Sequence, residues 1–195
     1  DGGVKTKKPP ATATGIRTYT VSVKGIDGKT YTTTKTETLA KTATELKETH
    51  VTAGNQVYNG TARKPAVVKV GTKTLTEGTD YTATYQNNQN VGTATVTITG
   101  KGNYTGTVTK TFAITQASLK NAMVSGLAAR TYNGTAQKPA PTVKVNLDGK
   151  TFTLKSGTDY TVTYKNNTNV GTATVTITGK GNFKDAVSKT FPIKA

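Results

Sequence analysis

Apolar and polar residues alternate along most of this chain. Between residues 93 and 99 the sequence TATVTIT places Ala94, Val96 and Ile98 at every second position, with threonines between them. Because successive side chains of a strand point to opposite faces, this pattern predicts a strand with one apolar and one hydroxylated face. The same pattern returns at residues 172–178. Each apolar face needs a second sheet to cover it.

Further short segments carry apolar residues with the same period of two. They are Tyr81, Ala83 and Tyr85; Tyr160, Val162 and Tyr164; Phe112 and Ile114; Phe191 and Ile193; Val68 and Val70; Val143 and Val145. Leu75 and Leu154 follow the last two segments at matching places and complete a set of about six short strands in each module. Asn-Gly dipeptides at residues 59–60 and 133–134 are typical of turns, because both residue types tolerate positive φ. No segment sustains a helical period. The sequence therefore predicts an all-β fold, a sandwich of short antiparallel strands over a thin core.

The chain also repeats itself. The segment NVGTATVTITGKGN occurs at residues 90–103 and again, unchanged, at residues 169–182. Of the 36 positions in residues 80–115, 26 are identical in residues 159–194. Such self-similarity at a fixed period indicates a tandem-repeat protein.

The repeat sets the domain boundaries that we expect. One module occupies residues 43–116 and a second occupies residues 117–195. Residues 1–15 combine glycine, lysine and proline without apolar periodicity, which is the composition of a linker. Residues 16–42 alternate tyrosine and valine with threonine around a GIDG turn, which predicts a β-hairpin or part of a third repeat.

The order of the motifs YNGTAxKP, GTDYTVTYxNN, NVGTATVTITGKGNY and KTFxI resembles the Ig-like β-sandwich repeats of secreted and surface proteins of Gram-positive bacteria. The resemblance covers residues 46–195. It implies a non-catalytic spacer or stalk module, placed outside the cell or on its surface. The partners that it implies are neighbouring domains of the same parent protein, and it carries no active site to transfer.

Composition narrows the possible chemistry. Threonine fills 45 of the 195 positions and cysteine none, so disulfides, thiolate metal sites and a cysteine nucleophile are excluded. The net charge is +16, but only three of the 26 basic residues are arginine, whereas base-reading surfaces favour the guanidinium fork. We therefore expect no nucleic-acid partner. No stretch of apolar residues is long enough to insert into a membrane.

Titratable residues for catalysis are scarce. His50 is the only histidine, and the second module has no counterpart of it. Asp80 and Asp159 are the only acids at matching places in both modules, and we expect each to accept backbone N–H groups in a turn, with a calcium site as the alternative. Tyr58 and Tyr132 likewise belong to the repeat signature. We predict no catalytic site, no metal site and no cofactor.

Aromatic residues without a counterpart in the other module are the remaining candidates for binding. They are Tyr19, Tyr31 and Phe152. Sugar rings stack on flat exposed side chains, so an alternative function is a carbohydrate-binding or adhesin module. Its ligand would be cell-wall glycan, or a dietary or host polysaccharide.

Overall fold

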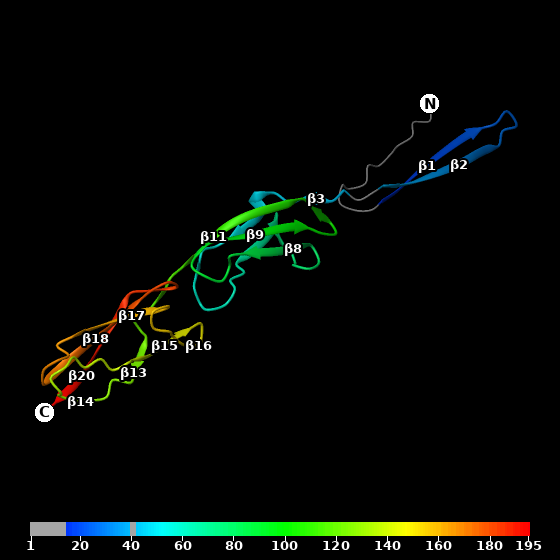
Figure 1. Cartoon of the computed structure of the whole chain (residues 1–195). Coiled ribbons are helices and arrows are strands. Elements are labelled where there is room, and N and C mark those ends of the chain that lie inside the picture. Colours follow the sequence, from blue (N-terminus) through cyan, green and yellow to red (C-terminus); the bar gives the residue numbers. More distant parts are fainter. Residues whose placement is uncertain (1–14, 40–41) are drawn as a thin grey trace. The chain divides into compact units, whose positions relative to one another are not determined.

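The computed structural model describes residues 15–39 and 42–195, and its regular elements are nearly all strands (Figure 1). The one helical element of these residues is a short 3-10 turn, η1, at Glu48–His50. This confirms the predicted all-β, sandwich-type fold. Apart from its last residue, the predicted linker at residues 1–15 lies outside the described residues. No described helix is long and apolar enough to cross a membrane.

A two-stranded hairpin comes first. Strand β1 (Gly15–Lys24) pairs antiparallel with β2 (Thr30–Leu39), as the alternation of tyrosine and valine with threonine predicts (Figure 1). In the turn Asp27 Oδ1 accepts the N–H of Lys29 at 3.0 Å, and Gly28 supplies a φ of 77°. The two strands pair only with each other among the described residues.

Residues 43–116, here called repeat 1, contribute nine strands. They are β3 (Thr44–Glu45), β4 (Val51–Ala53), β5 (Gln56–Val57), β6 (Ala66–Val70), β7 (Lys73–Thr74), β8 (Tyr81–Gln86), β9 (Gly92–Gly100), β10 (Tyr104–Thr105) and β11 (Thr107–Thr115). Their sheets have the strand orders β5-β11-β9-β8, β4-β6-β7 and β10-β3.

Residues 117–195, here called repeat 2, contribute nine more. They are β12 (Ala117–Ser118), β13 (Met123–Ser125), β14 (Arg130–Thr131), β15 (Thr142–Leu147), β16 (Lys150–Thr153), β17 (Tyr160–Lys165), β18 (Gly171–Gly179), β19 (Phe183–Lys184) and β20 (Ala186–Lys194). The sheet orders are β14-β20-β18-β17, β13-β15-β16 and β12-β19, which match those of repeat 1 strand for strand. The sequence repeat is therefore also a repeat of topology.

The long strands pair antiparallel, and several two-residue strands pair in parallel. In repeat 2, β18 pairs antiparallel with both β17 and β20, while β14 and β12 join β20 and β19 in parallel. The parallel pairs involve only two residues of each strand. A segment of two residues has no periodicity to read, so the alternation pattern predicts the antiparallel pairs alone.

The core of repeat 2 lies between its two larger sheets. Val175 and Ile177 of β18 have no exposed surface, and they form one cluster with Val143 and Val145 of β15 and with Phe183. The threonines of β18 alternate with these buried residues. The apolar face of the strand is thus covered by the second sheet, as the sequence predicts.

The described residues group into two compact units. The first contains the described residues up to Val51 with Val68–Thr84 and Thr97–Thr109; the second contains Thr52–Val67, Tyr85–Val96 and Lys110–Ala195. The second unit therefore takes in all of repeat 2 together with three segments of repeat 1. The contacts between the two repeats described below lie within this unit.

Strand β18 ends where the backbone of β19 comes very close. A Cβ atom added to Gly179 would lie 2.7 Å from the backbone nitrogen of Lys184. The N–H of Gly179 also donates to the carbonyl of Asp185 at 2.8 Å, so the two segments cannot separate without losing this bond. A side chain at this position has no room.

Substituting Gly179→Ala should therefore destabilise the protein by about 1–3 kcal/mol, because backbone must shift to admit the methyl group. Gly54→Ala is the matched control, since no atom lies within 4 Å of its added Cβ. Urea unfolding of both variants and of the unsubstituted chain measures the difference. Equal stability of the two variants would show that the close approach at Gly179 is not constrained as described.

Candidate functional site

An aromatic contact joins the two repeats within the second compact unit. Tyr58 follows β5, and its N–H donates to the carbonyl of Thr115 at 2.9 Å. The Tyr58 ring meets the ring of Phe183 edge to face, with centroids 5.4 Å apart and an angle of 83° between the planes. Phe183 is only 2% exposed and belongs to the core of repeat 2. Tyr58 of repeat 1 therefore packs against the core of its neighbour.

A glycine beside this tyrosine leaves space for a second aromatic residue of repeat 2. Gly60 has a φ of 80°, and a Cβ atom added to it would lie 2.7 Å from the ring of Phe152. Phe152 packs against the same core cluster, and the Nζ of Lys150 lies 5.4 Å from its ring centroid. A side chain at position 60 would displace the ring of Phe152.

Polar contacts surround the aromatic pair. Asp148 lies at the tip of the β15–β16 hairpin, where its Oδ2 accepts a hydrogen bond from Asn59 Nδ2 at 2.8 Å and one from Arg63 Nη1 at 3.1 Å. Arg63 is oriented by Gln56, whose Oε1 accepts from its Nε and Nη2 at 3.2 and 2.7 Å. Gln56 therefore fixes the orientation in which the Arg63 guanidinium binds the carboxylate of Asp148.

These hydrogen bonds change the titration of the hairpin tip. The amide of Asn59, and then the guanidinium of Arg63, hold the pKa of Asp148 below its usual range. Because the folded-state pKa is lowered, the contribution of this contact is complete above the usual aspartate range. It is lost as the pH falls through the lowered pKa. Asp148 is well exposed, so salt weakens the ionic part of the contact.

Backbone groups complete the surface between the repeats. The N–H of Val91 donates to Asn182 Oδ1 at 2.9 Å, and Asn182 Nδ2 donates to Asn90 Oδ1 at 3.1 Å. Gln116, between β11 and β12, donates through Nε2 to the carbonyls of Gly181 and Phe183, both at 3.0 Å. The connecting residue itself is therefore fixed to repeat 2.

Two sets of residues make up this contact, a tail surface on repeat 1 and a head surface on repeat 2. The tail surface of repeat 1 consists of Tyr58, Asn59, Gly60, Arg63 and Val91, and the head surface of repeat 2 consists of Asp148, Phe152, Asn182 and Phe183. Neither surface carries a general acid, a general base and a nucleophile together. What the arrangement can do chemically is bind, through one apolar and several polar contacts.

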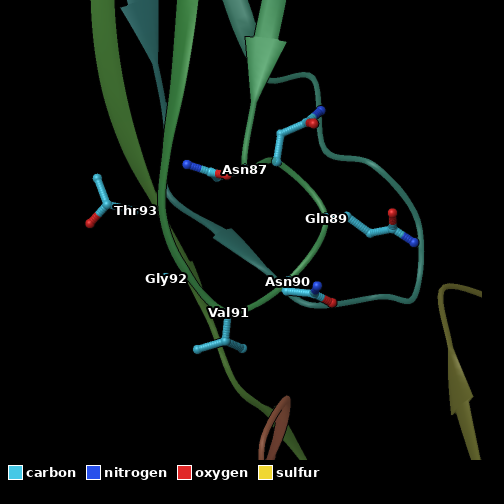
Figure 2. Close-up of a pocket in the computed structure, with 7 residues that line it drawn as sticks. Asn87, Gln89, Asn90, Val91, Gly92 and Thr93 are labelled. Carbon is cyan, nitrogen blue, oxygen red and sulfur yellow. The ribbon is translucent and has the colours of Figure 1, made fainter.

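A loop rich in amide side chains lies next to the tail surface. Its lining residues, drawn in Figure 2, enclose a hollow of about 510 Å³: Asn87, Asn88, Gln89, Asn90, Val91, Gly92 and Thr93. The backbone N–H of Arg63 donates to the backbone carbonyl of Asn88 at 2.7 Å and so ties the loop to the neighbouring segment. The equivalent loop of repeat 2 encloses about 300 Å³. Neither lining contains a titratable side chain, so these hollows offer hydrogen bonds and no acid–base chemistry.

The two repeat-signature acids sit in turns. Asp80 is 7% exposed, and its Oδ2 accepts the N–H of Thr76 at 3.1 Å and lies 3.4 Å from Lys73 Nζ. Asp159 Oδ2 accepts the N–H of Lys155 at 2.8 Å. In both repeats the carboxylate thus bonds a backbone N–H four residues earlier in the chain.

His50 also bonds the backbone close to it. Its Nδ1 accepts the N–H of Lys47 at 3.1 Å across the η1 turn. Among residues 15–39 and 42–195, no three histidine or acidic side chains gather closely enough to hold a metal ion. The structure therefore brings none of the titratable candidates together at one site.

The three unmatched aromatic residues have different surroundings. Tyr31 is 59% exposed, and its hydroxyl donates to Asp27 Oδ2 at 2.8 Å. Tyr19 is half-buried and donates to Glu37 Oε2 at 3.2 Å. Phe152 instead packs against the core of repeat 2 and against Gly60. The two tyrosines lie on the hairpin, whereas Phe152 belongs to the contact between the repeats.

Sequence reasoning had little means of finding most of the contact residues. Arg63, Asn59 and Asn182 occur in segments that read as ordinary turns. Besides the unmatched Phe152, the available signal is the longer loop of repeat 2 at residues 146–150, where Asn-Leu-Asp-Gly-Lys replaces a shorter Gly-Thr-Lys link. That insertion supplies Asp148, the acid that Asn59 and Arg63 bind.

Comparison with known proteins gives no match: no family model, no curated protein and no solved structure matches this chain.

Proposed function

We propose that this chain is a non-catalytic spacer of a larger secreted or cell-surface protein, built from Ig-like repeats of the kind found in Gram-positive bacteria. Its partners are then the neighbouring domains of the same protein. The observation that carries the proposal is the direct packing of Tyr58 on Phe183, which ties one repeat to the core of the next. A spacer works by holding its ends apart, and it needs joints that resist bending.

Three kinds of contact support such a joint. The aromatic pair buries apolar surface, the pair of Arg63 and Asp148 adds a charged hydrogen bond, and the bond from Val91 N–H to Asn182 fixes the backbone. Asp148 is exposed and salt screens an exposed ion pair, so the aromatic and backbone contacts matter more for stiffness. The surface threonines of the strands suit an extracellular scaffold that must stay in water.

Spin labels on the two sides of the contact test this proposal. Lys64→Cys and Lys144→Cys place one label in each repeat, both at exposed positions of the second unit, and the chain has no other cysteine. Double electron–electron resonance should give one narrow distance distribution. Adding Tyr58→Ala should broaden it, because the ring no longer packs on Phe183. Tyr132→Ala, at the matching place in repeat 2, is the control and should leave it narrow.

A broad distribution in the chain that carries only the two labels would contradict the proposal. It would mean that the repeats turn freely about Gln116 despite the contacts between them.

Carbohydrate binding is the second candidate, and one feature of the hairpin favours it. In the register of β1 with β2, Val23 lies opposite Tyr31. Tyr19, Val21 and Val23 occupy every second position of β1 and therefore share one face of the hairpin. Val21, Val23 and Tyr31 are all exposed. This face therefore presents aromatic and aliphatic side chains side by side, as a sugar-binding surface does.

Pull-down with insoluble cell-wall glycan and with dietary or host polysaccharides separates the two candidates. The spacer proposal predicts no saturable binding to any of them. Carbohydrate binding through the hairpin predicts saturable binding that Tyr31→Ala abolishes, because the exposed ring provides the stacking surface. Tyr132→Ala, which removes an exposed tyrosine elsewhere, is the matched control. Saturable binding that survives Tyr31→Ala would contradict the hairpin site.

A further inference from the structure

The residues that bind repeat 2 in repeat 1 have counterparts in repeat 2 itself. The tail surface of repeat 2 consists of Tyr132, Asn133, Gly134, Gln137 and Val170, which correspond in order to Tyr58, Asn59, Gly60, Arg63 and Val91. The correspondence rests on the shared YNGTA and NVGTATVTITGKGN segments, and on the matching places of β5 and β14 in their sheets.

The two tail surfaces differ in how far they are covered. Tyr132 is 47% exposed, whereas Tyr58 is half-buried against Phe183. Val170 is 55% exposed, whereas Val91 is half-buried. The same residue types in the same local fold are therefore exposed in repeat 2 and covered in repeat 1.

The glycines show the same difference more sharply. A Cβ atom added to Gly60 would collide with the ring of Phe152, but one added to Gly134 has no atom within 4 Å. The φ angles are nearly equal, 80° and 75°. The space beside the glycine that an aromatic ring occupies in repeat 1 is thus open in repeat 2.

The backbone of the second tail surface is already in its binding conformation. The N–H of Tyr132 donates to the carbonyl of Lys194 at 2.8 Å, and the equivalent bond in repeat 1 measures 2.9 Å. The N–H of Gln137 donates to the carbonyl of Asn167 at 2.6 Å, where the equivalent bond measures 2.7 Å. Binding of a partner would therefore lose little conformational entropy at this surface, because the surface is already ordered.

The tail surface of repeat 2 also keeps a positive charge. In repeat 1, Gln56 and Arg63 hydrogen-bond to each other, so these two positions are adjacent. In repeat 2 the same positions hold Arg130 and Gln137, the two residue types exchanged. Repeat 2 therefore keeps one guanidinium at this pair of positions. Gln137 Nε2 donates to Asn133 Oδ1, so an acidic group of a partner that bonds Asn133 also approaches the position of Arg130.

We propose that the tail surface of repeat 2 docks the head surface of another repeat of the second kind. The phenylalanine of that head packs on Tyr132, its asparagine accepts the N–H of Val170, and its hairpin acid binds Asn133 and Arg130. The inference rests on the proposed function, and it names the partner that such a spacer takes at this surface.

A second copy of this chain does not offer the same head. Its own repeat 2 head surface is covered by its repeat 1 through the contact of Tyr58 with Phe183. In repeat 1 the matching positions hold Lys73 and Tyr104, and the hairpin link Gly-Thr-Lys carries no acid. The partner is therefore a repeat with an acidic hairpin tip and a Gly-Asn-Phe turn.

A chain with one more repeat provides the test. Residues 116–195 are appended directly after Lys194, which takes the place that Thr115 has in the natural connection. Amide hydrogen exchange is then followed by NMR at Val170, with Val91 as the internal reference because its N–H is bonded to Asn182 in the unextended chain. Docking should slow exchange at Val170 about tenfold relative to the unextended chain.

Two matched variants of the extended chain sharpen the result. Asp148→Ala and Asn182→Ala, made only in the appended copy, should return Val170 to its rate in the unextended chain. Appending residues 43–116 instead supplies a head without the acid, and should slow the exchange of Val170 less. The exchange rate of core amides in the appended copy, such as that of Ile177, reports whether it is folded.

The outcomes separate the two proposals. Unchanged exchange at Val170 beside a folded appended repeat would overturn the docking inference, while slow exchange at Val91 would leave the spacer proposal standing. Fast exchange at Val91 in the unextended chain would count against the spacer itself. The double change Arg130→Gln with Gln137→Arg reproduces the arrangement of repeat 1, and fast exchange at Val170 in that extended variant would also overturn docking.

Discussion

Burial of one face of a single nine-residue strand organises each repeat. In β18, Ala173, Val175 and Ile177 have no exposed surface, and the strand contacts both β17 and β20 through its backbone. Its other face carries hydroxyl groups, such as the pair of Thr176 and Ser188 at 2.8 Å. The core is thin because only one side chain in two contributes to it. Because a small repeat with a thin core buries little apolar surface by itself, apolar contact with a neighbouring repeat adds noticeably to the surface that it buries.

The sequence allowed the strands to be predicted but not the contact between the repeats. Alternation identified β9 and β18, because burial of one face leaves a period of two. The two-residue parallel strands carry no such pattern. The contact of Tyr58 with Phe183 joins positions 125 residues apart, and both lie in segments whose local pattern only indicates turns and strands. Residue type alone does not predict which aromatic side chain packs against an aromatic side chain of the other repeat.

Near-identical segments have different surroundings in the two repeats, and these surroundings distinguish a covered tail surface from an exposed one. The valine of the NVG segment is half-buried as Val91 and exposed as Val170, although the 14 residues that begin one position earlier are the same. Two residues of the contact, the hairpin acid Asp148 and the aromatic Phe152, have no counterpart in repeat 1. Under the proposed spacer function, these two residues serve the joint between the repeats.

The aromatic contact should couple the stability of repeat 2 to that of repeat 1, and a double-mutant cycle measures that coupling directly. Tyr58→Ala and Phe183→Leu are made singly and together, and native-state hydrogen exchange of the core amides of repeat 2 gives its unfolding free energy. We expect a coupling energy of about 0.5–1.5 kcal/mol between the two positions. A coupling energy indistinguishable from zero would contradict this expectation, because the rings would then stabilise the two repeats independently.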